Sequence, residues 1–408
     1  MKQGPAIAVT GLGLVTAAGI GVDASWRGVC MGESTAARDP RLAGLPVDIS
    51  CTVPDFVPAR HVGPRSPLMH DRFVQLAVVA AREAVLDSGL DPESWDGARV
   101  GVVMGCGVGG VTTMETQHGR LLEKGPAAVS ALTVPMLVPN MVAGNLAMDL
   151  RATGPNLVTA TACASGATAI GTAAQLLREG ACDIVITGGS EAAVSRTLVT
   201  GFAQMGALSR RTGEPAAASR PFDRDRDGFV IGEGSGVLVL EREADARARG
   251  AGVRARIAGY GASADGHHLT APDPEGTAVL RAVHTAMEQA GVGPSEITHV
   301  NAHGTSTPLN DAVEARMLRR LLGDGAAVTS TKGVLGHTLG AAGAIEAVMT
   351  VLAIERATIP PTANHAQQDP AHELDLVTVA PREEKVEAAM SNSFGFGGQN
   401  AVLILTAA

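Results

Sequence analysis

Short apolar segments alternate with glycine-rich turns and alanine-rich segments along the whole chain. Apolar, β-branched runs predict strands at residues 6–9, 100–104, 184–187 and 235–240. Apolar residues at helical spacing predict helices over residues 73–88, 167–179 and 277–290. The alternation predicts an α/β fold in which helices cover both faces of the sheets.

The chain also shows signs of an internal repeat. Residues 229–240 and residues 394–405 both contain a Phe, a glycine turn and a final apolar strand. Residues 100–107 and residues 298–305 are each a strand that leads into a glycine turn. Each match is weak alone, but the common order favours duplication over chance similarity.

A third parallel concerns the helix predicted after Cys163, whose small residues recur in residues 340–347. We therefore expect two similar halves, residues 1–250 and residues 251–408. The charged residues 241–249 would join them.

Composition limits the class of protein. The chain has 408 residues, of which 45% are hydrophobic, 18% charged and only 2% aromatic. A net charge of −9 and the scarcity of aromatic side chains argue against nucleic-acid binding and against an anionic membrane as partner. No apolar run is long enough to span a bilayer, and the first residues lack the pattern of a signal peptide.

The five cysteines are Cys30, Cys51, Cys106, Cys163 and Cys182. Their number is odd, they are widely spaced, and no CxxC pair occurs. This pattern predicts neither a disulfide framework nor a metal site. We expect a cytoplasmic protein.

The run Val158-Thr-Ala-Thr-Ala-Cys-Ala-Ser-Gly-Ala-Thr168 carries the strongest chemical signal. It predicts a strand that feeds a helix, with Cys163 at the start of the helix. Unpaired N–H groups and the helix dipole at that position favour the thiolate, the nucleophile of acyl transfer. A small buried cysteine of no catalytic role is the alternative.

Three further segments are typical of site loops. Asn301-Ala-His-Gly-Thr-Ser-Thr-Pro308 contains His303, and Ser330-Thr-Lys-Gly-Val-Leu-Gly-His337 contains Lys332 and His337. Ser391-Asn-Ser-Phe-Gly-Phe-Gly-Gly398 is a glycine turn with two aromatic residues, Phe394 and Phe396. One cysteine and two loop histidines suggest thioester chemistry, in which imidazoles stabilise a forming enolate and turn N–H groups face an oxyanion. Either histidine alone could be structural.

In these motifs the chain resembles the β-ketoacyl-acyl-carrier-protein synthases of the thiolase superfamily. The matching motifs are Thr161-Ala-Cys-Ala-Ser165, Ile186-Thr-Gly-Gly-Ser-Glu191, Asp223-Arg-Asp-Arg-Asp-Gly-Phe-Val230, residues 301–308, residues 332–337 and residues 392–398. They occur in the family's order along essentially the whole chain. The resemblance implies a five-layered α-β-α-β-α fold built from two duplicated halves.

The resemblance also implies the roles of the main site residues. Cys163 would accept the acyl group from an acyl carrier protein, and the N–H groups of Cys163 and Phe396 would form the oxyanion hole. His303 and His337 would stabilise the enolate formed from malonyl carrier protein. Lys332 would orient the histidine loops, with Asp311, Glu314 or Glu346 as its carboxylate partner.

Seven residues would contact the substrate or flank its path. In the family's pattern Phe396 is also a gate for acyl chains, and Phe229 is a phenylalanine near the nucleophile. Thr305 and Thr307 match threonines that bind the pantetheine arm, and Val108 matches a residue that limits the acyl pocket. Phe394 lies in the turn of the gate. His268 lies in a loop similar to one beside the pantetheine entrance, although an exposed loop histidine is at least as plausible.

The resemblance leaves the biological setting open. We favour the catalytic α subunit of a type II polyketide synthase, paired with a chain-length-factor-like subunit; a highly reducing system would fit the motifs. The alternative is a homodimeric ketosynthase II of fatty acid synthesis, because residues 305–310 are closer to those enzymes. A non-catalytic chain-length partner is a third reading, disfavoured because the cysteine and both histidines are present. The 4′-phosphopantetheine arm belongs to the carrier protein, so no cofactor of the chain itself is expected.

Three weaker signals carry little weight. Gly11-Leu-Gly13 follows the first predicted strand like the start of a dinucleotide fingerprint, but Thr16 stands where that fingerprint needs its third glycine. The segment from Asp223 to Gly228 resembles a calcium loop but has Gly234 at the twelfth position, so an ion-paired or solvated turn is expected. A basic patch that could suit an acidic carrier protein would comprise Arg60, Arg65, Arg72, Arg210 and Arg211.

Overall fold

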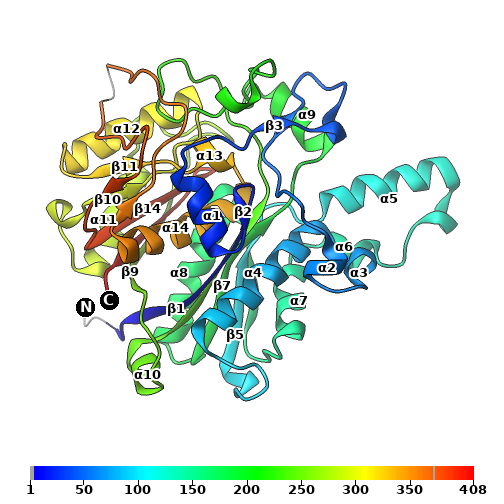
Figure 1. The fold of residues 1–408 in the computed structure, drawn as a ribbon, viewed down its shortest axis with the longest axis horizontal. Helices are drawn as coiled ribbons and strands as arrows, with labels where there is room; N and C mark the ends of the chain where they lie inside the picture. The colour runs from blue at the N-terminus through cyan, green and yellow to red at the C-terminus, as the bar shows by residue number, and fades with distance from the viewer. Residues whose placement is uncertain (1–3, 371–372) are drawn as a thin grey trace.

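The computed structural model describes residues 4–370 and 373–408 and contains a large mixed sheet with helices on its faces (Figure 1). In the N-terminal half the strand order is β6-β5-β7-β8-β1, and in the C-terminal half it is β11-β10-β14-β15-β9. The N-terminal strands are β1 (Ile7–Thr16), β5 (Val100–Gly105), β6 (Asn156–Thr159), β7 (Ile184–Glu191) and β8 (Gly234–Arg242). The C-terminal strands are β9 (Ala255–Ala264), β10 (His299–Asn301), β11 (Ala327–Thr329), β14 (Ala388–Gly395) and β15 (Gln399–Thr406).

The two halves of the sheet meet where β1 pairs with β9 over two residues. The short strand β2 (Gly19–Ile20) adds to β1. Two small two-stranded sheets lie outside this sheet: β3 (Ala37–Arg38) pairs with β4 (Ile49–Ser50), and β12 (Thr358–Ile359) with β13 (Arg382–Glu383).

The helices complete five layers. The central layer is α8 (Ser165–Arg178) and α14 (Ala342–Arg356), which pack on each other between the two halves of the sheet. The outer layers are α4 (Arg72–Ser88) with α7 (Met141–Asp149), and α11 (Thr277–Ala290) with α12 (Pro308–Leu322). The remaining helices are α1 (Val22–Cys30), α2 (Pro58–His61), α3 (Ser66–Met69), α5 (Val111–Lys124), α6 (Thr133–Leu137), α9 (Arg196–Gln204), α10 (Glu243–Ala248) and α13 (Lys332–Leu335). The predicted α/β class and layered arrangement are confirmed.

The pairing of the strands reveals the duplication directly. In each half two parallel pairs are followed by two antiparallel pairs, so that β1, β5, β6, β7 and β8 correspond to β9, β10, β11, β14 and β15. The three parallels seen in the sequence fall on equivalent elements: β8 and β15, β5 and β10, and α8 and α14. The expected boundary at residue 250 falls between α10 and β9 and remains a prediction.

The first strand is longer than predicted. It was expected to end at residue 9, but β1 runs on through Gly11 and Gly13 to Thr16. A Cβ atom at Gly11 would lie 2.0 Å from the carbonyl oxygen of Ala84, and one at Gly13 would lie 1.8 Å from that of Ala80. These glycines therefore allow α4 to lie directly on the strand.

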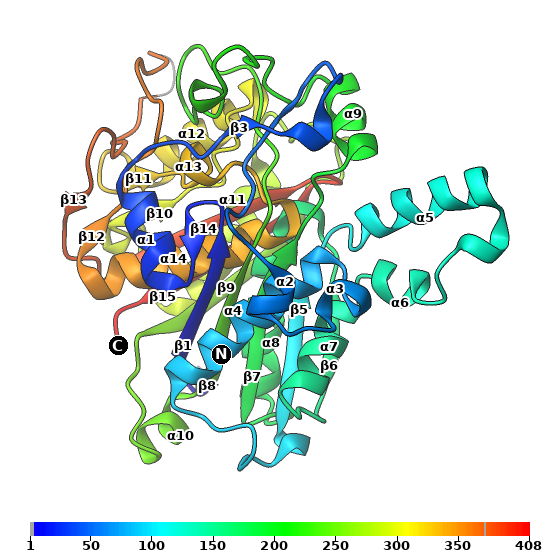
Figure 2. The same ribbon diagram turned by 45° about the vertical axis from the view of Figure 1, so that its right-hand side comes forward.

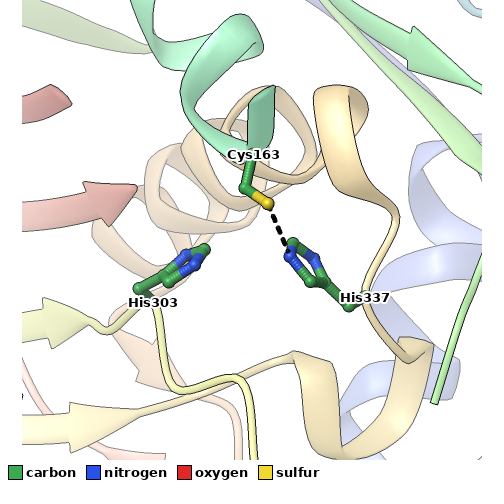
Figure 3. Close-up of side chains that lie close together, drawn as sticks. All are labelled: Cys163, His303 and His337. Atoms are coloured by element: carbon green, nitrogen blue, oxygen red, sulfur yellow. Dashed lines mark hydrogen bonds between the residues drawn. The ribbon is translucent and has the colours of Figure 1, made fainter. Parts of the chain in front are cut away.

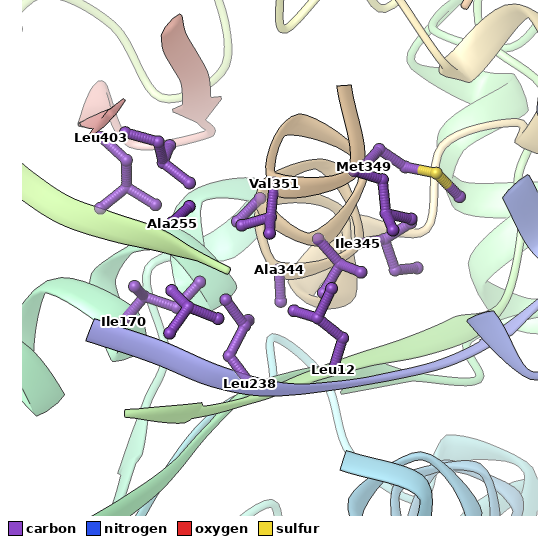
Figure 4. Close-up of a cluster of buried hydrophobic side chains, with 14 of the residues drawn as sticks. Leu12, Ile170, Leu238, Ala255, Ala344, Ile345, Met349, Val351 and Leu403 are labelled. Atoms are coloured by element: carbon purple, nitrogen blue, oxygen red, sulfur yellow. The ribbon is translucent and has the colours of Figure 1, made fainter. Parts of the chain in front are cut away.

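The core is built around α14, which is buried on nearly all sides (Figure 4). Ala344 and Ile345 of this helix pack with Leu12 of β1 and Leu238 of β8 in one hydrophobic cluster. The same cluster includes Ile170 of α8, Leu403 of β15 and many alanines. Small and branched side chains replace the scarce aromatic residues, which lets the layers approach closely.

The helices α5 and α6 form an arm that extends away from the body of the protein (Figures 1 and 2). In the described part of the chain, no helix is long and apolar enough to cross a membrane. All five cysteines are free thiols.

Candidate active site

Cys163 lies at the junction between β6 and α8, in the single 3-10 turn Ala162–Ala164 that precedes the helix. The turn requires Ala162 to adopt a φ of 49°, a conformation that is uncommon for a residue with a side chain. Ser165 stabilises it by donating its hydroxyl to the carbonyl of Ala162 and accepting the N–H of Thr161. This local strain directs the thiol into a cavity beneath the helix end.

Two histidines converge on this thiol from the other half of the protein (Figure 3). The Nε2 atom of His337 lies 3.0 Å from the Sγ atom of Cys163. The rings of His303 and His337 are 5.4 Å apart at 83° to each other. All three side chains are at least 93% buried, so their mutual placement is well defined by packing.

Backbone contacts hold each histidine in place. His303 follows β10, and its N–H donates to the carboxylate of Glu314 on α12 at 2.8 Å. Glu314 also accepts the N–H of Gly304 and the amide of Asn392. His337 donates its backbone N–H to the carbonyl of Val230, and its own carbonyl accepts the N–H of Gly232. The two bonds form a parallel bridge between His337 and Ile231.

Burial is the main influence on the pKa values of Cys163, His303 and His337. It lowers the pKa of His303 and of His337 well below the usual value, and the charge of Lys332 lowers both further. Burial also raises the pKa of the Cys163 thiol to about 11, although Lys332 and the N–H of Phe396 act against it. The expected resting thiolate is therefore wrong: helix-end effects do not outweigh removal of the thiol from water.

Lys332 lies behind the histidines on α13, a single helical turn rather than the predicted loop. Its ammonium group forms a fully buried ion pair and hydrogen bond with Glu346 of α14. Of the three carboxylates considered as its partner, Glu346 is therefore the one. Burial raises the pKa of the Glu346 carboxyl to about 7.

A cavity of about 530 Å³ opens onto the thiol. Nine of the predicted site residues line it: Cys163, His303, His337, Phe396, Phe394, Phe229, Thr305, Thr307 and Val108. Its walls are mostly apolar, while the hydroxyl groups of Thr305 and Thr307 are hydrogen-bonded to each other at 2.9 Å. The shape suits a long apolar chain that ends at a reactive carbonyl.

Most of the chain matches one family of enzymes. Residues 5–246 match the Beta-ketoacyl synthase, N-terminal domain, and residues 254–366 match the Beta-ketoacyl synthase, C-terminal domain. The chain belongs to the β-ketoacyl synthase family. As a member of this family it is an acyltransferase of the β-ketoacyl-acyl-carrier-protein synthase type, and its buried Cys-His-His group is consistent with that chemistry.

Relatives and solved structures cover nearly the full chain. The 3-oxoacyl-[acyl-carrier-protein] synthase 2 of Staphylococcus aureus (strain COL) is 41% identical over 409 residues, which cover 99% of each protein. The structure of the ishigamide ketosynthase/chain length factor is 35% identical with a TM-score of 0.91, covering 99% of this chain and 100% of that one. A type II PKS acyl-carrier protein in complex with its ketosynthase bound to the hexaketide gives 30% identity, a TM-score of 0.90 and full coverage of both chains.

Two predicted site residues of this β-ketoacyl synthase lie outside the cavity. Lys332 is buried and does not line it. His268 is exposed, and its Nδ1 atom accepts the N–H groups of Thr270 and Ala271, which do line the cavity. Its contact with a substrate stays a prediction, while its visible contacts shape the entrance loop.

The glycine turn also differs from its predicted extent. Residues up to Gly395 belong to β14, and the turn comprises Phe396 and the two glycines that follow. Gly397 donates its N–H to the carbonyl of Leu269 at 2.7 Å, and Asp265 donates its N–H to Gly398. The turn with Phe396 is thus attached to the entrance loop.

Sequence reasoning missed Phe202 on α9, which lines the cavity. Its ring lies 5.4 Å from that of Phe229 and 6.3 Å from that of Phe396. The available signal was composition, because the chain has only seven Phe residues. Met205, which follows Phe202 closely in the chain, was missed as well. Both residues were missed because neither lies in a polar or glycine-rich motif.

The proposed basic patch is smaller than expected. Arg72 is paired with the buried carboxylate of Glu233, and Arg211 is partly buried beside Asp227. Arg60, Arg65 and Arg210 are exposed. The Asp223 turn is ion-paired, as expected: the buried Asp223 carboxylate accepts a hydrogen bond from the guanidinium of Arg220, while Arg224 and Asp225 are exposed.

The ligand atoms of Cys163, His303 and His337 lie within 4.8 Å of one another, so the group must also be considered as a metal site. A zinc ion bound to both a thiolate and an imidazole would separate the two ligand atoms by about 3.5 Å. The 3.0 Å separation of Sγ and Nε2 is that of a direct hydrogen bond. A site without a metal remains our expectation.

Proposed function

We propose that the protein catalyses decarboxylating Claisen condensation between an acyl group held on Cys163 and malonyl-acyl carrier protein, which gives a 3-ketoacyl-acyl carrier protein. The observation that carries this proposal is the position of the Cys163 thiol, within 3.0 Å of an imidazole and at the wall of an apolar cavity. A second imidazole faces the same space.

In the first step, the sulfur of Cys163 attacks the thioester of the acyl carrier protein. His337 is neutral and accepts the thiol proton at Nε2 as the carbon–sulfur bond forms. The proton then passes to the departing pantetheine sulfur, so the imidazole is neutral again. The N–H of Phe396, which already hydrogen-bonds to the sulfur, and that of Cys163 stabilise the oxyanion.

In the second step, the malonyl group loses carbon dioxide next to both histidines. The neutral imidazole of His303 donates a hydrogen bond to the enolate oxygen, which is the site of developing negative charge. His337 donates a second one in the neutral tautomer that carries its proton on Nε2, so its ring proton changes position between the two steps. The enolate carbon attacks the Cys163 thioester and forms the new carbon–carbon bond. Cys163 leaves as a thiolate and regains a proton from solvent.

The path of the carrier arm follows the polar side of the cavity. The hydroxyls of Thr305 and Thr307 offer hydrogen bonds to the amide groups of pantetheine. Exposed Met205 and Leu309 line the same cavity, and Arg210, which follows Met205 closely in the chain, is an exposed cation. Such a rim of apolar and cationic side chains suits an acidic carrier protein.

For the biological setting, we propose the catalytic α subunit of a type II polyketide synthase, with a chain-length-factor-like subunit as partner. Similarity to the ishigamide ketosynthase/chain length factor supports this setting. A homodimeric ketosynthase II of fatty acid synthesis is the second candidate, favoured by the 41% identity to the Staphylococcus aureus synthase. A non-catalytic partner subunit is disfavoured, because it would not need a nucleophile placed against a general base.

The test uses the purified chain with acyl- and malonyl-loaded carrier protein, and mass spectrometry of the carrier-bound products. We expect a 3-ketoacyl product longer by two carbons, and its loss in Cys163→Ala. Product from the chain alone indicates the homodimeric setting; product only after co-expression with a chain-length-factor-like subunit indicates the polyketide setting. Unchanged malonyl turnover and product in Cys163→Ala would contradict the mechanism.

A further inference from the structure

Glu191 is a buried carboxylate that the mechanism does not use. It is the last residue of β7, and its side chain has no exposed surface. Burial raises the pKa of its carboxyl, which shows how unfavourable this environment is for a charge. A group of this kind needs strong hydrogen bonds to persist in the core.

The partners of this carboxylate all belong to one loop. It accepts the N–H groups of Gly107 at 2.7 Å, of Val108 at 3.2 Å and of Gly109 at 3.1 Å. The thiol of Cys106 contacts it as well, at 3.4 Å. Three consecutive backbone donors thus converge on one side chain and hold the loop against the end of β7.

The loop held by Glu191 forms part of the cavity wall. Gly107 and Val108 both line the cavity that contains Cys163, while the carboxylate itself does not. On its other side the loop is bound by the arm, through the N–H of Gly110 and the carbonyl of Leu137. The position of Val108 is therefore determined by backbone contacts on both sides.

The surrounding backbone leaves no room for another arrangement. A Cβ atom at Gly107 would lie 2.9 Å from Oε2 of Glu191, and one at Gly340 would lie 2.6 Å from the same oxygen. Gly340 belongs to the turn that follows His337. The carboxylate is thus enclosed between the cavity loop and the segment that carries the general base.

We propose that Glu191 is a positioning residue that fixes Val108 in the cavity wall and so sets the length of acyl chain that the cavity accepts. The proposal rests on the proposed function in that the natural occupant of the cavity is taken to be an acyl chain. A carboxylate is required because its two oxygens only accept hydrogen bonds. In Glu191→Gln, the amide group would present N–H groups to backbone N–H donors, and the loop would have to move.

The experiment measures chain-length selection directly at Cys163. The purified protein is treated with N-hexyl- and N-decyl-iodoacetamide, and alkylation of Cys163 is followed by peptide mass spectrometry. We expect Glu191→Gln to change the ratio of the two rates by about tenfold, the size expected when an apolar pocket changes by a methylene group. Loss of the Glu191 charge would change the reactivity of the Cys163 sulfur equally toward both reagents, so this effect cancels in the ratio of the two rates. The ratio therefore reports the shape of the cavity.

Two comparisons separate a positioning role from general damage to the fold. Glu83→Gln is the matched control, because Glu83 also accepts two backbone N–H groups, of Leu14 and Val22, but does not line or border the cavity. Val108→Ala should change the ratio by itself, and adding Glu191→Gln to it should change the ratio little further. Rate ratios equal to wild type in folded Glu191→Gln, or fully additive effects of the two substitutions, would overturn the proposal.

The same variants are assayed in parallel for acyl transfer from carrier protein. Alkylation needs only a thiol and a cavity, so its ratio tests Glu191 even if no condensation occurs. Loss of chain selection with no carrier-dependent activity in wild type would refute the proposed function and leave the role of Glu191 supported. Normal condensation, with a rate ratio in Glu191→Gln equal to that of wild type, would support the proposed function and refute the role of Glu191.

Discussion

Cys163 experiences opposing influences on its reactivity. Its place before α8 and the charge of Lys332 favour a thiolate, whereas full burial favours the thiol. Burial prevails, and the pKa of the thiol rises to about 11. The nucleophile must therefore be deprotonated as it reacts, which gives the 3.0 Å contact with His337 a chemical purpose.

This protonation state can be tested by the pH dependence of alkylation. With a pKa of about 11, the thiolate fraction of Cys163 grows with every pH unit, so the rate with iodoacetamide should rise about tenfold per unit between pH 6.5 and 9 without a plateau. His337 cannot flatten this profile, because its pKa lies well below 6.5 and it stays neutral throughout. A rate that is already constant at neutral pH would mean that a resting thiolate–imidazolium pair exists.

At the scale of elements, the contact between β1 and α4 depends on the absence of side chains. Gly13 is in a strand, where glycine is normally unfavourable, and its backbone conformation is one that other residues adopt. Glycine is needed here because there is no space for a side chain: the carbonyl of Ala80 in α4 occupies the position that a Cβ atom would take. Gly13 therefore allows α4 to pack closely on β1, and it does not form a turn.

Gly13→Ala should therefore destabilise the protein by about 3 kcal/mol, as expected for overpacking of a rigid core. The matched control is Gly119→Ala in α5, where a Cβ atom would meet nothing within 4 Å; it should stabilise the helix by about 0.5 to 1 kcal/mol. Urea unfolding followed by circular dichroism measures both. Equal midpoints for the two variants would contradict the role assigned to Gly13.

The same strand explains what sequence reasoning could and could not reach. Apolar runs and helical spacing identified strands such as β5 and helices such as α11 with nearly correct bounds. The first strand was predicted to end at residue 9, because a local pattern cannot show that a distant helix lies against the glycines that follow. The charge state of Cys163 was misjudged for a similar reason, since burial is a property of the folded chain.

At the scale of the whole molecule, the duplication produces two equivalent turns with different roles. Ala162 and Leu339 both have a φ of 49°, and each begins a 3-10 turn that leads into a central helix, α8 or α14. In the first half the next residue is the nucleophile Cys163. In the second half it is Gly340, which lies against Gly107 and Glu191 where no side chain fits. One repeat thus supplies the thiol, and the other supplies both histidines.

The arm formed by α5 and α6 carries exposed apolar side chains. Leu122 and Val134 on the arm are 73% and 63% exposed, and Leu157 lies on β6, the edge strand of the N-terminal half of the sheet. An exposed apolar arm beside an open sheet edge is typical of a subunit interface. The arm also contacts Gly110 through Leu137, so a partner bound there would adjoin the cavity loop.

Leu122→Glu should accordingly weaken subunit association, because it would bury a carboxylate in an apolar contact. Leu86→Glu is the matched control: Leu86 is 81% exposed on α4, away from the arm. If the purified wild type sediments as a dimer, Leu86→Glu should remain a dimer and Leu122→Glu should shift toward monomer in sedimentation velocity. If wild type sediments as a monomer, the same variants are compared for retention of the co-expressed partner subunit. Equal association of both variants, with a second copy or with that subunit, would place the interface elsewhere on the protein.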